Sequence, residues 1–224
     1  MAVTNYPKVT QFPTVEAFRE FLKKENLEIG LADKVPAAPD SALSKPIQCY
    51  GKKIGNRWSI LPMEGWDCEA DGAPSELTKR RWLRFAGSGA KLLCGTEAAA
   101  VMHSGRSNPY QLMVGLQLTH SGRYSHPNRS DKLEARTAWA HPLLDQKFHC
   151  GPENVVSDAE VEDIVKHFVH AAEIAYNAGF DFVDIKHAHG YLGYEFLTAY
   201  DRKGKYGGSF ENRTRFFREI AEGI

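Results

Sequence analysis

The sequence lacks a long hydrophobic run, and this excludes proteins that depend on one. Its 224 residues are 42% hydrophobic and 25% charged, yet no stretch approaches the roughly 18 consecutive apolar residues of a membrane-spanning helix. The first residues, MAVTNYPKVTQF, have neither the basic nor the apolar region of a secretory signal. We therefore expect a globular cytoplasmic protein without a membrane partner.

The sequence also lacks an excess of positive or negative charge, and it lacks any close pair of cysteines. Lys plus Arg total 28, as do Asp plus Glu, so net charge gives no indication of a nucleic-acid partner. Four cysteines lie far apart without a CxxC pair: Cys49, Cys68, Cys94 and Cys150. This spacing is typical of reduced thiols rather than of a disulfide framework or a zinc site, and we expect no bound metal.

Apolar runs alternate with helical patterns, as in a parallel α/β protein. The sequence nevertheless lacks the GxGxxG turn that anchors a dinucleotide in doubly wound sheets. Polar or glycine-rich sequence follows each expected strand at once, which favours a TIM (β/α)8 barrel over a doubly wound sheet. The expected strands cover residues 57–63, 91–94, 111–118 and the segment that begins at Gly179. Helices are expected over residues 15–25, 74–85, 157–178 and 212–220, and an irregular passage over residues 126–154. The expected N-caps of the first three helices are Thr14, Ser75 and Ser157, the last in a capping box with Glu160.

Residues 1–45 are expected to form an N-terminal extension with one short helix, because Pro36, Pro39 and Pro46 then interrupt regular structure. Residues 46–224 are expected to form the N-terminal half of a barrel. A complete barrel has eight strands and about 250 residues, so only about the first four β/α units are predicted here. We expect the chain to be the amino-terminal part of a longer protein, and its open sheet edge leaves homo-oligomer formation open.

One stretch, GFDFVDIKHAHGYLGYE, concentrates polar groups where a strand should end. Val183 and Ile185 alternate with Asp184 and Lys186, the period of a strand. His187, His189, Gly190 and Tyr191 follow directly. Because chemistry in such folds collects at the carboxyl ends of strands, this stretch is predicted to be an active-site edge.

The HGYL of this stretch and YGGSFENRTRF, residues 206–216, together resemble the old yellow enzyme family of flavin-dependent ene-reductases, with its dienoyl-CoA reductase relatives. The segments GNRWSILPM, GTEAAAV and GLQLTHSGR resemble the motifs of that family's first three strands. The resemblance covers roughly residues 54–220. It implies an FMN-dependent oxidoreductase that passes hydride from NADH or NADPH through the flavin to a small-molecule, carbonyl-conjugated alkene.

The resemblance also implies which residues hold the cofactor. Pro62, Met63 and the backbone of Glu64 would contact the isoalloxazine ring, where backbone N–H groups can tune the flavin. Ala98 would lie close to the ring, and the amide of Gln117, both donor and acceptor, would meet its pyrimidine edge. Family members usually carry Thr or Cys where Glu64 stands. Their later strands supply the FMN phosphate site, and some relatives add an iron–sulfur centre, which is left open here.

At the fourth strand, the family places two donors that bind the substrate carbonyl oxygen, and Lys186 and His189 match these positions. Tyr191 matches the residue that often delivers the proton. Donors preorganised around an oxygen that gains negative charge are effective catalysts, and a tyrosine hydroxyl can protonate the α-carbon. Lys186 stands where a histidine is usual, and the alternative for it is an ion pair with Asp184.

Three other interpretations remain open. A flavin-dependent amine dehydrogenase or demethylase would share the barrel and the cofactor. A metal-dependent barrel hydrolase would use His187 and His189 with His120 and Asp184, but it gives no role to HGYL and YGGSFENR. A non-catalytic half-barrel would act as a binding scaffold.

Overall fold

The computed structural model describes residues 6–94, 97–111, 113 and 116–224. The chain divides into two compact units, Met1–Arg57 and Trp58–Ile224, and each is described by itself. The boundary expected from the sequence, between residues 45 and 46, stays a prediction.

From residue 6 on, the first unit holds one α-helix and one β-hairpin. Helix α1 (Val15–Lys24) begins where Thr14 Oγ1 accepts a hydrogen bond from the Ala17 N–H at 3.1 Å, which confirms the predicted helix and its cap. Strands β1 (Ile47–Cys49) and β2 (Lys52–Ile54) pair antiparallel. The sequence did not predict this hairpin, whose strands are only three residues long and mostly exposed. Its two-residue turn relies on positive φ at Tyr50 and Gly51, 46° and 77°.

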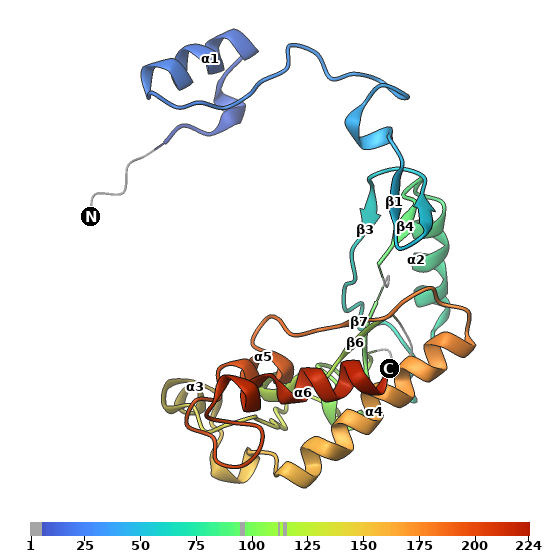
Figure 1. Cartoon of the computed structure of the whole chain (residues 1–224), viewed down its shortest axis with the longest axis vertical. Coiled ribbons are helices and arrows are strands. Elements are labelled where there is room, and N and C mark those ends of the chain that lie inside the picture. The colour runs from blue at the N-terminus through green and yellow to red at the C-terminus, as the bar shows by residue number, and fades with distance from the viewer. Residues whose placement is uncertain (1–5, 95–96, 112, 114–115) are drawn as a thin grey trace. The chain divides into compact units, whose positions relative to one another are not determined.

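The second unit is built on parallel strands, as predicted (Figure 1). Strand β3 (Ser59–Ile60) pairs with β4 (Leu92–Leu93), and β5 (Ala98–Ala100), β6 (Gln117–Thr119) and β7 (Asp184–Ile185) form a sheet in that order. Parallel pairing brings the carboxyl ends of neighbouring strands to one edge.

Two strand predictions differ from the structure. Strand β5 lies in the GTEAAAV motif, beyond the strand expected over residues 91–94, and alanine has little intrinsic preference for strands. Gly95 and Thr96 of that motif lie outside the described residues. The strand expected over residues 111–118 begins only at Gln117, with Leu112, Val114 and Gly115 also outside the described residues, while Gln111 is fully buried in a turn.

The helices of the second unit are α2 (Glu76–Ala86), α3 (Pro142–Phe148), α4 (Asp158–Asn177), α5 (Leu192–Leu197) and α6 (Phe210–Gly223). The capping box of Ser157 and Glu160 begins α4 as predicted, and Ser75 and Ser209 cap α2 and α6. Helix α3 lies inside the passage expected to be irregular. No helix in the described ranges is long and apolar enough to cross a membrane.

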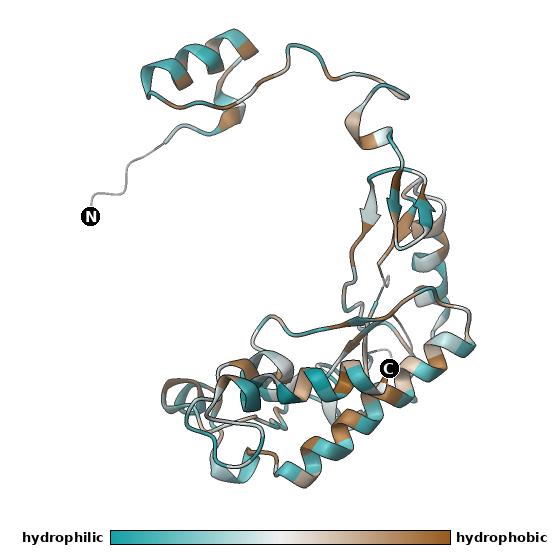
Figure 2. Cartoon of the chain, viewed as in Figure 1, coloured by the Kyte–Doolittle hydropathy of each residue, from teal (hydrophilic) through white to brown (hydrophobic). Residues whose placement is uncertain are grey.

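The core lies where α4, α5 and α6 pack on β6. Figure 2 shows hydrophobic and hydrophilic residues interleaved along α4 and α6, as expected of helices with one buried face. The ring of Phe216 meets those of Phe168 and Phe196, with centroids 5.8 Å and 4.7 Å apart. The other fully or nearly fully buried members include Val161, Ile164, Leu192 and Ile220. Because Leu192 directly follows Tyr191, this core fixes the start of α5 and the HGYL loop before it.

A buried ion-pair network ties the passage of residues 126–154 to α5. Arg123 is fully buried, and its Nε donates to Glu195 Oε1 at 2.5 Å, while its guanidinium also pairs with Asp145. Glu195 Oε2 accepts from the Ala138 N–H at 2.9 Å. Burial raises the pKa of Glu195, and the hydrogen bond from Ala138 and the charge of Arg123 act in the opposite direction. Arg123 therefore supports the structure around the site.

Candidate active site

Three side chains from distant parts of the sequence meet at the end of β7. Lys186 Nζ lies 3.1 Å from Glu64 Oε1, and the Tyr191 hydroxyl donates to the same oxygen at 2.9 Å. The Lys186 and Glu64 side chains are only 8% and 11% exposed. Two donors, one directly after β7 and one at the N-cap of α5, thus converge on one oxygen atom.

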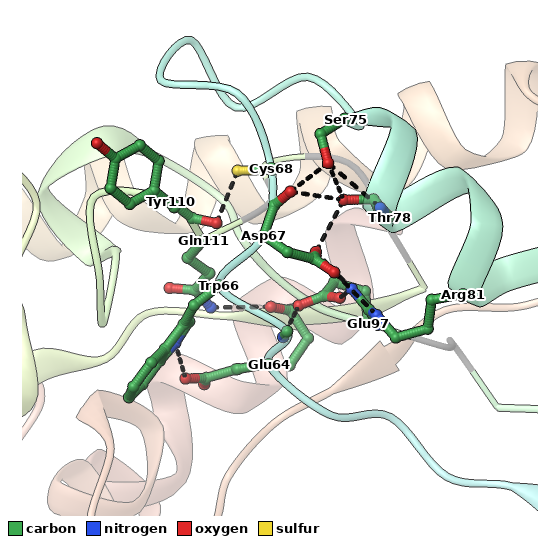
Figure 3. A network of polar contacts seen from close by, with 12 residues as sticks. Glu64, Trp66, Asp67, Cys68, Ser75, Thr78, Arg81, Glu97, Tyr110 and Gln111 are labelled. Carbon is green, nitrogen blue, oxygen red and sulfur yellow. Dashed lines mark hydrogen bonds and ion pairs between the residues drawn. The ribbon is translucent and has the colours of Figure 1, made fainter.

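The second oxygen of Glu64 lies 3.1 Å from the Tyr191 hydroxyl and has two further donors nearby. Ser107 Oγ donates to Glu64 Oε2 at 2.5 Å, and Trp66 Nε1 lies 3.2 Å from the same oxygen. Figure 3 shows the Trp66 indole nitrogen turned toward this carboxylate. Ser107 is itself fixed, because its backbone N–H donates to Gln111 Oε1 at 2.6 Å. The carboxylate of Glu64 therefore has donors around both oxygens.

A tight turn brings Tyr191 back toward Lys186. His189 and Gly190 both have positive φ, 60° and 71°, and Tyr191 then serves as the N-cap of α5. Glycine suits position 190, because side chains rarely adopt a positive φ without strain. As a result Lys186 Nζ lies 3.9 Å from the centroid of the Tyr191 ring, a cation–π geometry.

The environment keeps the Tyr191 hydroxyl protonated. Burial raises the pKa of Tyr191 well above its ordinary value, and the negative charge and hydrogen bond of Glu64 raise it further. A phenol in this state remains a proton donor across the physiological pH range.

The loop that carries Glu64 is anchored by a second polar network, drawn in Figure 3. Arg81 Nη2 lies between Asp67 Oδ1, at 2.7 Å, and Glu97 Oε2, at 2.6 Å. Glu97 is 1% exposed, and its Oε1 accepts from the Gly65 N–H at 2.6 Å. Burial raises the pKa of Glu97 against the opposing effects of Gly65 and Arg81. The residue after Glu64 is therefore tied to the segment just before β5.

Sequence reasoning missed Arg81, Glu97 and Asp67 as parts of this site. Burial alone would raise the pKa of Asp67, but hydrogen bonds from Arg81 and Thr78 lower it. The available signal was a glutamate in a run of small, buried residues, where a charged side chain needs a partner. Nothing in the spacing identified Arg81 as that partner.

Asp184 does not pair with Lys186, so that alternative is wrong. Asp184 Oδ2 instead accepts from Gln117 Nε2 at 2.6 Å, while Lys186 is directed to Glu64. Asp184 and Lys186 lie on the same face of the strand but have different partners. Gln117 is the partner of Asp184 because the two residues lie opposite each other in the register of β6 and β7.

The residues predicted to hold the flavin differ in position and in exposure, since Ala98 and Gln117 begin β5 and β6 and Met63 follows β3. Met63 is 72% exposed and Ala98 is 1% exposed, and Pro62 is half-buried. The Ala98 carbonyl accepts from Gln111 Nε2 at 2.8 Å. Gln111 thereby supports both Ala98 and Ser107, a role that the sequence did not indicate.

The histidines of the HAHG segment do not gather into a metal site. His189 is exposed, and in the described ranges no hydrogen bond joins it to Lys186 or Glu64. The His187 ring packs against Phe216 and Phe217, with centroids 5.7 Å and 5.1 Å apart, and burial lowers its pKa. Among the described residues, no group of three His, Cys, Asp or Glu side chains could hold a metal ion, so the cluster that a hydrolase needs is not assembled there.

Comparison with solved structures gives the fold class. The old yellow enzyme from Pichia sp. AKU4542 superposes with a TM-score of 0.70 at 24% identity, over 83% of this chain and 56% of that one. The fold is thus that of the TIM-barrel old yellow enzymes. That the chain holds four β/α units stays a prediction.

The sequence comparisons give the family. The family model described as the NADH:flavin oxidoreductase / NADH oxidase family matches residues 108–224, and the chain belongs to this FMN-dependent family. The NADPH dehydrogenase of Geobacillus sp. (strain WCH70) is 30% identical over 211 residues, 83% of this chain and 60% of that protein. The NADPH dehydrogenase of Clostridium acetobutylicum is 38% identical over 117 residues, 51% of this chain and 33% of that protein. The chain thus spans between a third and three fifths of the length of these relatives.

Two features of the segment after β3 suit an FMN ring. Met63 presents an exposed apolar side chain at the end of the β3 segment, the kind of surface that a planar ring would cover. In the part of the chain that the structure describes, no acceptor pairs with the Glu64 backbone N–H, which leaves a donor for a polar ring edge.

Proposed function

We propose that this chain binds FMN and contributes the active site for NAD(P)H-dependent reduction of a carbonyl-conjugated alkene. The observation that carries the proposal is the convergence of Lys186 Nζ and the Tyr191 hydroxyl on one oxygen, at 3.1 Å and 2.9 Å. Two donors around one oxygen suit a carbonyl that gains negative charge during the reaction. Membership of an FMN-dependent family and relatives named NADPH dehydrogenase support the cofactor and the reductant.

In this proposal Lys186 donates a hydrogen bond to the carbonyl oxygen of the substrate and stabilises the charge that develops there. The hydride for the β-carbon would come from bound FMN, which NADPH or NADH would reduce. Tyr191 gives its hydroxyl proton to the α-carbon. Because that carbon is two bonds from the carbonyl oxygen, a hydroxyl that reaches the oxygen is also near the carbon. His189 is proposed as a further donor from the same loop.

The cofactor residues remain part of the proposal. Pro62, Met63 and the Glu64 backbone would contact the ring, Ala98 would lie close to it, and the Gln117 amide would bind its polar edge.

The test uses the purified whole protein. FMN content is measured first, and the bound flavin is then reduced anaerobically with NADPH and, separately, with NADH. We expect 2-cyclohexenone to reoxidise the reduced flavin, whereas the saturated control cyclohexanone should not. Reoxidation by neither compound, together with reduction of the flavin by a tertiary amine, would support the amine dehydrogenase interpretation instead.

A further inference from the structure

The position where Lys186 and Tyr191 converge is filled in this structure by a side chain of the protein itself. That side chain, Glu64, carries a negative charge into a site of two donors. We infer that Glu64 is a specificity-determining residue that acts as an internal counter-ion and makes the site prefer uncharged carbonyl compounds to carboxylates. The inference rests on the proposed function, because it takes Lys186 as the donor to the substrate oxygen and Tyr191 as the proton donor beside it.

The first step of the argument concerns charge. The Lys186 ammonium is balanced by the Glu64 carboxylate, and Asp184 is engaged with Gln117. A carboxylate ligand bound at Lys186 would stand beside Glu64, and two like charges in a largely buried site repel. A neutral carbonyl oxygen escapes this repulsion. An ammonium group has three donors, so Lys186 can bind such an oxygen and keep Glu64.

The second step is that Glu64 is held in place. Its Oε2 accepts from Ser107 at 2.5 Å and from Trp66 at 3.2 Å, contacts that do not involve Lys186 or Tyr191. The following residue, Gly65, donates its N–H to the buried Glu97 at 2.6 Å. Because these contacts hold the Glu64 carboxylate in place, it remains next to a bound ligand. Its negative charge therefore contributes to the free energy of binding.

The experiment compares two ligands of nearly the same shape, benzoate and benzamide, which differ in charge. Their affinities for the whole FMN-loaded protein are measured by calorimetry near neutral pH, with the flavin spectrum as a second readout. We expect the native protein to bind benzamide more tightly than benzoate. Glu64→Gln should tighten benzoate binding by about tenfold or more and change benzamide binding by less than about threefold. Glu64→Asp keeps the charge and should keep the native preference.

Two further variants complete the design. Glu64→Thr, a second neutral variant, should show the same shift and serves if Glu64→Gln does not fold. Lys186→Met in the Glu64→Gln background should remove the gain for benzoate, because the gain depends on the unpaired ammonium.

The outcomes separate this inference from the proposed function. If Lys186→Met weakens ligand binding but neither neutral variant changes the ratio of benzoate to benzamide affinity, the inference is overturned and the donor assignment stands. If Lys186→Met and Tyr191→Phe leave both affinities unchanged, or if neither ligand binds any variant, the donor assignment fails and the inference fails with it.

Discussion

Lys186 and Glu64, which are 122 positions apart in the chain, form an ion pair with Lys186 Nζ 3.1 Å from Glu64 Oε1. One residue follows β3 and the other follows β7. The carboxyl ends of parallel strands in a barrel face the same side, so loops from distant parts of the sequence meet there. Tyr191 joins this pair from the start of α5, which makes the site a product of three separate segments.

Replacing Tyr191 with Phe should affect one half-reaction only. Reduction of the flavin by the nicotinamide should remain nearly intact, while reoxidation by an enone should slow by roughly 10²-fold or more, because the proton donor is lost. Stopped-flow absorbance of the flavin measures both steps. Tyr194→Phe, on the exposed side of the same helix, is the matched control and should slow neither. Equal slowing of both half-reactions in Tyr191→Phe would instead mean a packing role.

Replacing Glu64 with Gln should lower the pKa of Tyr191 toward its ordinary value. Burial raises this pKa first, and the charge and hydrogen bond of Glu64 add to it, so removing the charge removes part of the shift and leaves the effect of burial. An ultraviolet titration of tyrosinate, with Tyr191→Phe as the reference, measures the change. An unchanged pKa would show that Glu64 does not act on the hydroxyl.

Replacing Arg81 with Met should destabilise the protein by about 3–5 kcal/mol, because the buried carboxylate of Glu97 would lose its partner. Urea unfolding measures the loss. Lys79→Met removes an exposed pair with Glu76 and should cost less than about 1 kcal/mol. Adding Glu97→Gln to Arg81→Met should recover part of the stability, since position 97 then carries no buried charge that lacks its ion-pair partner. A double variant that is less stable than Arg81→Met would contradict this explanation.

The buried His120 should make stability depend on pH. Burial lowers the pKa of His120 from 6.5 to about 3, so the folded state keeps the ring neutral while the unfolded chain protonates it. Its stabilising contribution is therefore complete above about pH 6.5 and is lost as the pH falls toward 3, with a loss of about 2 kcal/mol by about pH 5.

Unfolding in urea at neutral pH and at about pH 5 tests this in the native protein and in His120→Gln. The native protein should lose about 2 kcal/mol more than the variant between the two conditions. His170→Gln, which changes an exposed imidazole, is the control and should behave as the native protein does. Equal pH dependence in the native protein and His120→Gln would rule out His120 as the titrating group.

Local features of the sequence predicted those parts of the fold that depend on local interactions. The caps at Thr14, Ser75 and Ser157 were confirmed, because a cap involves residues only three positions apart. The parallel arrangement was also predicted correctly, from alternating strand and helix patterns. Strand β5 was missed, since three alanines become a strand only through pairing with β6.

The partners of the site residues could not be predicted in the same way. The period-2 alternation placed Asp184 and Lys186 on the same face of one strand, which suggested that they pair with each other. The structure gives them Gln117 and Glu64 instead, because residues of neighbouring strands and loops lie closer than the spacing along one strand allows. Arg81 and Glu97 were missed for the same reason, since α2 and the start of β5 meet only in the folded chain.

The sequence by itself determined the family, the parallel β/α order and the candidate residues at each strand end, because motifs and periodicity are properties of short segments. The tertiary structure alone decided that Glu64 lies between Lys186 and Tyr191, that Asp184 belongs to Gln117, and that Arg81 joins Asp67 to Glu97. These contacts depend on how loops from different strands are positioned in space. Sequence periodicity therefore does not predict which of several charged side chains form ion pairs.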